Sequence, residues 1–370
     1  MAIEFHALRV SAITRETTDA VAVAFDLPPN LLDLFKYKPG QYLTLRLFID
    51  GKDVRRSYSL CSAPTRDGDP TIAVKQVDGG LASTYINTKL QVGDTIDVMP
   101  PLGNFAVDLK PYHAKHYVLI GAGSGITPLM SILLGVLDSE PDSRVTLLYG
   151  NRDSDSIIFN RQLQDLAQRE PRRFKLVSIL SRPGDDWQGL RGRIEKDSCG
   201  DMVRNCIAAS DIANCWYYLC GPSGMMVAAQ AALRGLGVPD NRVFREYFTT
   251  PLGGAGSADV SAAVSDEDDD ALTNKSGFEK SIVKVRLYGI EHELQVAPGE
   301  TILDVAVREE VDPPFACQIG ACCTCRAKLL EGKVEMDERE ALTDEEIEEG
   351  FILTCQSHPR SARLVVDYDQ

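Results

Sequence analysis

Residues 317–325 read CQIGACCTC, and a further cysteine, Cys355, is separated from Cys325 by 29 residues. This Cys-x4-Cys-x2-Cys spacing with a distant fourth cysteine is the plant-type pattern that holds a two-iron two-sulfur (2Fe-2S) cluster. The expected thiolate ligands are Cys317, Cys322, Cys325 and Cys355. A four-cysteine structural zinc site is the alternative, but such sites favour paired Cys-x2-Cys motifs and only one occurs here.

The rest of the cysteine loop has simpler expected roles. Cys323 lies beside a ligand and is expected to be a non-ligand. Gly320 should let the loop backbone approach the sulfides, to which exposed N–H groups can hydrogen-bond. Five of the 10 cysteines in the chain lie between 317 and 355. That clustering indicates metal binding rather than a disulfide framework.

Upstream of this loop, Pro251–Gly277 reads PLGGAGSADVSAAVSDEDDDALTNKSG. The segment has almost no large apolar side chains, so we expect a flexible acidic linker. It separates a C-terminal module from the rest of the 370-residue chain. The predicted division is 1–110, 111–248, a linker at 249–279, and 280–370.

Charge is spread unevenly along the chain. The net charge of −15 comes from residues 249–279 (−6) and 280–370 (−9), while residues 1–248 are neutral overall. A general basic surface for nucleic acid is therefore not expected. The run Asp337–Glu349 holds eight acids and one base, and it is either a docking face for a basic partner or a solvated surface.

Three regions of the chain differ in their pattern of apolar and turn residues, and these patterns predict the fold. Short runs such as Leu43–Leu47, Thr71–Val77 and Thr95–Met99, separated by turns, indicate a small antiparallel barrel. From about residue 113, apolar strands alternate with helical stretches such as Pro128–Leu137 and Asn160–Arg169. That alternation favours a doubly wound parallel α/β sheet. The last 90 residues begin with a predicted hairpin and a helix at Ile302–Glu309.

Two motifs in the barrel suit a phosphate-bearing flavin. Arg56-Ser57-Tyr58-Ser59 offers a guanidinium for a pyrophosphate, an aromatic ring for the flavin and a hydroxyl for its reactive nitrogen. The segment Gly80–Thr84 adds the small or hydroxylated residues Gly80, Ser83 and Thr84. Taken alone, the first motif is better explained as an ordinary strand with an exposed arginine.

Two further motifs follow predicted strands of the α/β region. The turn Gly121-x-Gly123-x-Gly125-Ile126-Thr127-Pro128 opens a helix, where backbone N–H groups attract a dinucleotide pyrophosphate. A glycine turn without ligand is the alternative. The motif Cys220-Gly221-Pro222-Ser223-Gly224-Met225 places Cys220 at the carboxyl end of a strand, facing the ligand crevice. Cys220 as a small buried apolar residue is the competing interpretation.

In this order, and followed by Glu246-Tyr247-Phe248, the motifs resemble the ferredoxin–NADP reductase superfamily over residues 1–248. Residues 280–370 resemble a plant-type ferredoxin, which implies an α+β β-grasp fold. The order flavin, nicotinamide, ferredoxin is similar to that of reductase components of bacterial oxygenases. The segments CQIGACCTCRAKLLEG and ILTCQSHPRS most resemble the reductase subunits of ring-1,2-phenylacetyl-CoA epoxidases.

The resemblance implies a role for each motif. FAD would be held by Arg56, Tyr58 and Ser59, with Gly80, Ser83 and Thr84 at its phosphates. The nicotinamide dinucleotide would lie on Gly121–Pro128, with Thr127 near the nicotinamide and Cys220, Gly221, Pro222 and Met225 beside it. Ser59, Cys220 and Glu246 would form the catalytic group, and Phe248 would lie near the flavin.

The choice between NADPH and NADH depends on Ser181-Arg182, which ends the predicted strand Lys175–Leu180. Phosphate-selecting members of the superfamily bind the 2′-phosphate with such a pair. Those members often add a lysine and a tyrosine, where this chain has Trp187 and Gly189; Arg152 and Arg191 are possible substitutes. We expect NADPH, with NADH and a merely solvated loop as the alternatives.

The expected function is transfer of electrons from NADPH through FAD and a 2Fe-2S cluster to a terminal oxygenase, most similar to the phenylacetyl-CoA epoxidase. The alternatives are an NADH-dependent reductase of a Rieske-type hydroxylase, including a steroid hydroxylase, or of another diiron monooxygenase. A redox sensor without turnover is the non-enzymatic alternative. The N-terminus shows no targeting signal, so we expect a cytoplasmic protein without a membrane-spanning segment.

Overall fold

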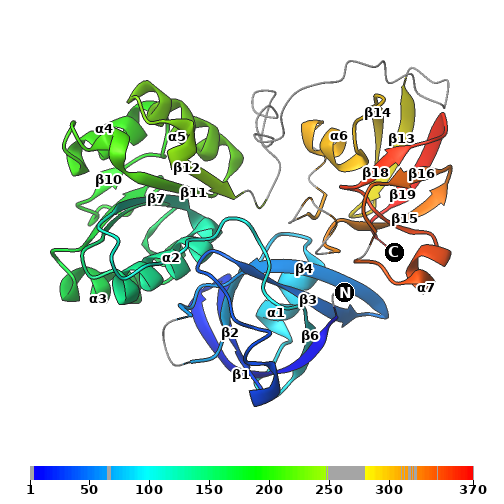
Figure 1. Cartoon of the computed structure of the whole chain (residues 1–370), viewed down its shortest axis with the longest axis horizontal. Helices are drawn as coiled ribbons and strands as arrows, with labels where there is room; N and C mark the ends of the chain where they lie inside the picture. Colours follow the sequence, from blue (N-terminus) through cyan, green and yellow to red (C-terminus); the bar gives the residue numbers. More distant parts are fainter. Residues whose placement is uncertain are drawn as a thin grey trace. The chain divides into compact units, whose positions relative to one another are not determined.

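The computed structural model describes residues 4–64, 68–246, 248, 280–309, 311, 313–315, 318, 320, 323–339 and 341–369. The chain separates into two compact units (Figure 1). One extends from Ile3 to Phe248, and the other includes every described residue from Lys280 onward. The predicted linker at 249–279 and Tyr247 lie outside the described residues.

The first unit begins with an antiparallel barrel, as predicted. Its strands are β1 (His6–Thr17), β2 (Ala20–Asp26), β3 (Tyr42–Ile49), β4 (Lys52–Ser59), β5 (Thr71–Lys75) and β6 (Thr95–Val98). They pair in the order β4-β3-β6-β1-β2-β5, and a bridge between Leu60 and Ile72 links the two ends of the row. Alternate strand residues fill the interior. Helix α1 (Leu81–Thr88) packs on this core through Ala82 and Ile86.

A six-stranded parallel sheet follows in the same unit. The strands are β7 (His116–Ala122), β8 (Arg144–Asn151), β9 (Phe174–Leu180), β10 (Leu190–Arg191), β11 (Trp216–Cys220) and β12 (Val243–Glu246). Their order β10-β9-β8-β7-β11-β12 reverses direction beside β7, which is the switch point of a doubly wound sheet. Ligands bind such sheets outside the carboxyl ends of the strands at this point.

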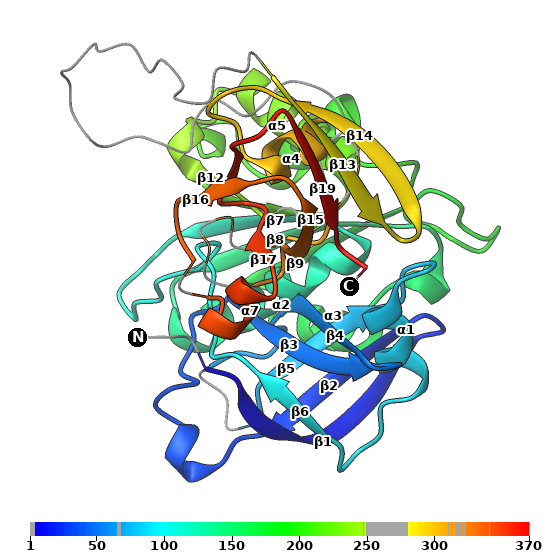
Figure 2. The same ribbon diagram turned by 90° about the vertical axis from the view of Figure 1, so that its right-hand side faces the viewer.

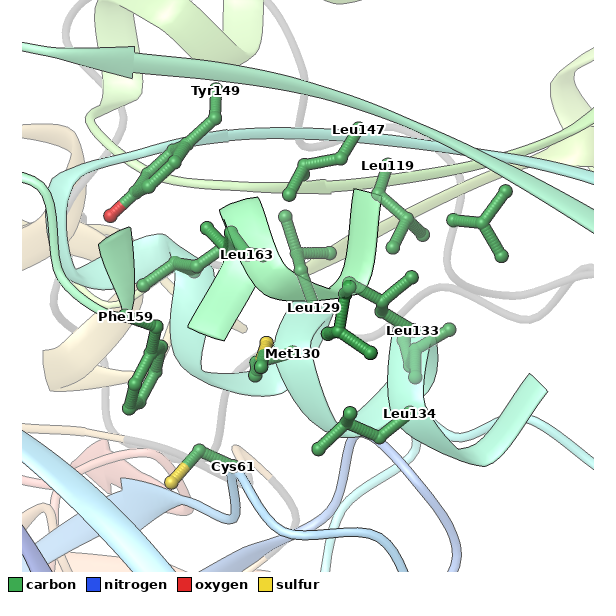
Figure 3. Packing of buried hydrophobic residues seen from close by; sticks show 14 of the residues in the cluster. Cys61, Leu119, Leu129, Met130, Leu133, Leu134, Leu147, Tyr149, Phe159 and Leu163 are labelled. Carbon is green, nitrogen blue, oxygen red and sulfur yellow. The ribbon is translucent and has the colours of Figure 1, made fainter. Parts of the chain in front are cut away.

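Helices cover both faces of the parallel sheet. They are α2 (Ile126–Ser139), α3 (Asn160–Arg169), α4 (Lys196–Cys206) and α5 (Ser223–Gly235). On one face, Leu129 and Leu133 of α2 pack against Leu119 and Leu147 of the strands (Figure 3). Helices α4 and α5 supply the separate core of the other face. The predicted helix Asn160–Arg169 is found with the expected bounds.

Barrel and sheet are joined within this unit by polar and apolar contacts. The Ser131 hydroxyl of α2 donates to the Ser62 carbonyl at 2.6 Å, and the Phe159 N–H donates to Glu16 of β1 at 3.2 Å. Cys61 and Met130 belong to the same buried cluster (Figure 3). These contacts fix the barrel strand that ends at Ser59 against the carboxyl end of the parallel sheet.

The second unit is a mixed sheet with short helices (Figure 2). Its elements are β13 (Ser281–Leu287), β14 (Ile290–Val296), α6 (Ile302–Arg308), β15 (Arg326–Glu331), β16 (Val334–Met336), α7 (Asp344–Glu348), β17 (Phe351–Leu353), β18 (Ser357–Pro359) and β19 (Arg363–Asp367). The five main strands run in the order β14-β13-β19-β15-β17, with β13 and β19 parallel. The predicted β-grasp arrangement is therefore confirmed.

The remaining short elements are single 3-10 turns: Pro29–Leu31, Gly123–Gly125, Ser154–Ser156, Ile212–Asn214 and Asp240–Arg242. Among the described residues, none of the helices is both long enough and apolar enough to cross a membrane.

Candidate active site and cluster site

Strand β4 presents its motif residues on two faces. Arg56 lies opposite the fully buried Leu45, and Tyr58 lies opposite the fully buried Leu43. Directly paired residues share a face of the sheet, so Arg56 and Tyr58 point to one side and Ser59 to the other. The Arg56 guanidinium donates to the Arg55 carbonyl at 2.8 Å, and the Tyr58 ring packs against the barrel core.

The segment Gly80–Thr84 forms the start of α1. Gly80 is the N-terminal cap residue, and a Cβ there would lie 2.6 Å from the Ser83 hydroxyl. That hydroxyl accepts from the Val77 N–H at 3.1 Å, so Ser83 shapes the turn that leads into the helix. The free N–H groups of a helix start, together with Arg56, suit the phosphates of FAD.

The glycine-rich turn packs closely on the neighbouring strand. A Cβ on Gly125 would lie 2.1 Å from the Cys220 carbonyl oxygen, and one on Gly121 would lie 2.6 Å from a Leu129 methyl group. By contrast, Gly123 has a φ of +54° and no atom within 4 Å of a built Cβ. The turn is therefore tight on its protein side and open beside Gly123, as a dinucleotide phosphate requires.

Thr127 and Pro128 lie in the first turn of α2 and are both buried. The Thr127 hydroxyl donates to the Ser124 carbonyl at 3.1 Å, which closes the helix start. One residue that supports this turn was not predicted from the sequence. The fully buried Tyr149 of β8, labelled in Figure 3, donates its hydroxyl to the Gly123 carbonyl at 3.0 Å. Nothing in the spacing of the chain points to it.

The three predicted catalytic residues meet where barrel and sheet join. Cys220 and Glu246 are paired neighbours at the carboxyl ends of β11 and β12. The Ser59 hydroxyl donates to Glu246 Oε2 at 3.3 Å, across 187 positions of sequence. Burial raises the pKa of Glu246 to about 8, although the bond from Ser59 works in the opposite direction. Burial, reinforced by the Glu246 charge, also holds the pKa of the Cys220 thiol well above its usual value.

This arrangement can hold or release a proton near neutral pH. The Cys220 thiol is fully buried and protonated, so it contributes shape rather than nucleophilicity. Gly221 has a φ of +157°, and a Cβ there would lie 3.0 Å from the Ala122 backbone nitrogen. Pro222 caps α5, whose buried Met225 lies against Gly221. Phe248 is partly exposed, at 37%.

The Ser181-Arg182 pair leaves the carboxyl end of β9 toward solvent. Backbone bonds from Ser181 to Asn151 (3.0 Å) and from Arg182 to Arg152 (2.7 Å) hold its main chain, while the Arg182 side chain is exposed. Both of the auxiliary arginines considered above already have protein partners. Arg152 pairs with Asp153 at 3.1 Å, and Arg191 donates to the Trp187 carbonyl at 3.0 Å.

Two of the four predicted cluster ligands are described. Cys325 and Cys355 are both buried and belong to one side-chain cluster. Cys317 and Cys322 lie outside the described residues, and among those described no group of metal-binding side chains reaches three. Gln318, which follows Cys317, accepts a hydrogen bond from Gln356, which follows Cys355. The described backbone therefore brings the two ligand segments together, as a four-thiolate cluster requires.

Two further residues of the cysteine loop, Gly320 and Cys323, are held by contacts with the protein. Gly320 has a φ of +76°, and a Cβ there would lie 3.0 Å from Glu338 and 3.2 Å from Gln356. Glycine is therefore favoured at position 320 for a second reason, because a larger residue would crowd these protein side chains. The Cys323 thiol donates to the Ala341 carbonyl, which supports its interpretation as a non-ligand.

Comparison with known proteins agrees with this three-part arrangement. Residues 7–107 match an oxidoreductase FAD-binding domain, residues 119–231 an oxidoreductase NAD-binding domain, and residues 285–360 a 2Fe-2S iron-sulfur cluster binding domain. The chain belongs to the family of FAD- and 2Fe-2S-containing oxidoreductases that carry these domains in this order. It is an NAD(P)H-dependent enzyme of the ferredoxin reductase type.

Two relatives share this arrangement over nearly their whole length. One component of the 1,2-phenylacetyl-CoA epoxidase of Escherichia coli K12 is 37% identical, over 99% of this chain and 98% of that protein. The ferredoxin reductase component of the 3-ketosteroid-9-alpha-monooxygenase of Rhodococcus rhodochrous is 35% identical, over 98% and 96%. The solved phthalate dioxygenase reductase has the same fold, with a TM-score of 0.55, 23% identity and 98% coverage of both chains.

Proposed function

We propose that this chain is the NADPH-dependent reductase component of a phenylacetyl-CoA epoxidase. The single observation that carries the electron-transfer function is the meeting of Ser59, Cys220 and Glu246 at the junction of barrel and sheet. The similarity to the epoxidase component supports the identity of the partner. We keep the division into 1–110, 111–248, 249–279 and 280–370 as part of this proposal.

The proposal assigns a role to each motif. Arg56 and the start of α1 would bind the FAD phosphates, and Tyr58 would pack on the flavin. Gly123 and the start of α2 bind the dinucleotide phosphates. Cys220 would exclude water beside the nicotinamide, and Glu246, whose Oε2 accepts from the Ser59 hydroxyl, would hold a proton. Cys317, Cys322, Cys325 and Cys355 hold the cluster. When bound, FAD supplies the conversion from two-electron to one-electron transfer that the cluster needs.

A second candidate is a reductase for a steroid hydroxylase of the Rieske type, with NADH as donor. The 35% identity to the 3-ketosteroid monooxygenase component favours it. Acidic side chains in the loop after Arg182, at Asp185 and Asp186, are compatible with a nucleotide that lacks the 2′-phosphate.

Reconstitution separates these candidates. The purified chain is combined with the oxygenase components of the E. coli epoxidase and phenylacetyl-CoA, or with the Rhodococcus steroid oxygenase and a 3-ketosteroid. We expect product formation coupled to NADPH oxidation with the epoxidase, at least about tenfold faster than with the steroid enzyme, which is about 1.4 kcal/mol in activation free energy. Faster coupling to the steroid oxygenase would overturn the assignment of the partner, without affecting the reductase chemistry.

A further inference from the structure

Gln356 follows the ligand Cys355 and lies against the cluster loop. Its side chain is only 8% exposed. Its amide nitrogen lies 2.9 Å from the Gln318 carbonyl, 2.9 Å from the Cys355 carbonyl and 3.6 Å from the Cys355 sulfur. The two amide hydrogens therefore serve one acceptor on the loop and two acceptors on Cys355.

These contacts join the two ligand segments through one side chain. Gln318 adjoins Cys317 in sequence, whereas Cys355 follows β17. The Gln356 methylene chain also lies 3.2 Å from the built Cβ of Gly320, so the loop backbone packs on it. A shorter or branched side chain would not make both contacts.

We propose that Gln356 is a positioning residue that raises the reduction potential of the 2Fe-2S cluster by donating an N–H to the Cys355 sulfur while it holds the ligand loop. Reduction adds one negative charge, part of which resides on the ligand sulfurs. An N–H directed at such a sulfur stabilises the reduced form more than the oxidised form. The low exposure of the amide strengthens this effect because water does not screen it.

A second hydrogen-bond chain in the same unit provides a matched control. The Tyr368 hydroxyl donates to the Thr354 hydroxyl at 2.7 Å, and Thr354 donates to the Cys325 carbonyl at 3.0 Å. This chain ends on the backbone carbonyl of a ligand rather than on its sulfur. Tyr368→Phe removes one buried hydrogen bond and leaves the Gln356 amide in place.

The test compares Gln356→Met, Gln356→Glu and Tyr368→Phe in the full-length holoprotein, after iron and sulfide analysis. The midpoint potential of the cluster is measured by redox titration. We expect Gln356→Met to lower the equilibrium constant for reduction about three- to tenfold, or about 28–59 mV for one electron. Gln356→Glu should lower it further by adding negative charge, and Tyr368→Phe should leave it unchanged.

Resonance Raman spectra give an independent readout. In wild type, exchange into D2O should shift the Fe–S(Cys) bands through the N–H donor, and Gln356→Met should lose part of that shift. If Gln356→Met does not retain its cluster, the deuterium shift in Gln356→Glu decides the question, because a carboxylate has no N–H to donate to the Cys355 sulfur. An unchanged potential in the cluster-containing Gln356 variants, or an equal change in Tyr368→Phe, would overturn the proposal.

Discussion

The buried carboxylate of Glu140 organises the C-terminal end of helix α2 through several hydrogen bonds. It has no exposed surface and terminates α2, where it accepts from the Ser143 hydroxyl (2.7 Å), the Tyr117 hydroxyl (3.0 Å) and the Lys110 N–H (3.0 Å). His113 Nδ1 lies 2.7 Å from Oε1, the oxygen that also accepts from Lys110. Arg173 adds its guanidinium to the carbonyls of Leu137 and Glu140. The network joins the C-terminal end of α2, the amino end of β7 and the residue before β9, at the opposite end of α2 from the glycine-rich turn.

Glu140→Gln should destabilise the first unit by about 2–4 kcal/mol, because buried donors lose their charged acceptor. Tyr117→Phe removes one of these bonds and should cost only about 1 kcal/mol. Urea unfolding followed by release of flavin fluorescence measures both values. Equal effects in the two variants would show that the charge of Glu140 contributes nothing beyond a single hydrogen bond.

The same carboxylate makes stability depend on pH. Burial alone would raise the pKa of Glu140, but the bonds from Ser143, Lys110, His113 and Tyr117 outweigh it and lower the pKa. A lowered carboxyl pKa contributes stability above its unfolded value, and that stability is lost as pH falls through the folded value. The advantage of wild type over Glu140→Gln should therefore be full at pH 7 and shrink below about pH 4.5.

At the scale of elements, the carboxyl end of β9 determines nucleotide choice if the proposal is correct. Arg182→Ala should remove a charge-assisted bond to the 2′-phosphate, worth about 1.5–3 kcal/mol. KM for NADPH should rise roughly 10–150-fold with little change for NADH. Arg191→Ala is the control, because Arg191 donates to the loop carbonyls of Gly184 and Trp187 and should affect both nucleotides alike. Equal effects of Arg182→Ala on both nucleotides would reject the assignment.

Helix α7 carries four of the eight acids in the run Asp337–Glu349 that is proposed to dock a partner, and these four are not equivalent. Glu346 pairs with Arg326 at 2.8 Å, with side-chain exposures of only 13% and 8%. Arg326 in turn lies over the Phe351 ring. Glu346 is therefore part of the packing of the second unit, whereas Glu345 and Glu348 are exposed. A charge-reversal test belongs at the exposed pair.

The double variant Glu345→Lys/Glu348→Lys should slow electron transfer to the oxygenase several-fold at ~50 mM salt, because complementary charge speeds encounter. The wild-type rate should fall as salt rises to ~300 mM. Reduction of ferricyanide by the flavin should change little. Glu293→Lys, on the exposed side of β14, is the matched control. A similar loss in the control, or an unaffected double variant, would identify the acidic run as a solvated surface only.

At the scale of the whole molecule, the two units have separate cores. Cys355→Ser should therefore abolish the cluster and spare the flavin site formed by residues up to Phe248. The variant should reduce ferricyanide with NADPH at close to the wild-type rate, yet fail with cytochrome c reduced through the cluster. Iron, sulfide and flavin analysis checks the premise. Loss of flavin together with the cluster would show that the units do not fold independently.

The sequence by itself determined the modules of this protein. Local spacing identifies a cluster loop at 317–325, and hydrophobic periodicity predicts barrel, parallel sheet and helices, because both depend on neighbouring residues in the chain. The helix Asn160–Arg169 and the strand ending at Leu180 were predicted for that reason. The family resemblance predicts that Ser59, Cys220 and Glu246 lie together in the active site, although they are far apart in the sequence.

Only the tertiary structure decided which side chains act together. Tyr149 supports Gly123, Glu346 forms an ion pair with Arg326 inside the second unit, and Gln356 joins two ligand segments. The structure also supplies the hydrogen bond between Ser59 and Glu246, a pair that the family resemblance had grouped. Each of these contacts links residues that are at least 20 positions apart, and no local pattern encodes them. Their energies depend on burial, which exists only once the strands and helices have packed. For the same reason the raised pKa of Glu246 is a property of the fold rather than of the motif around it.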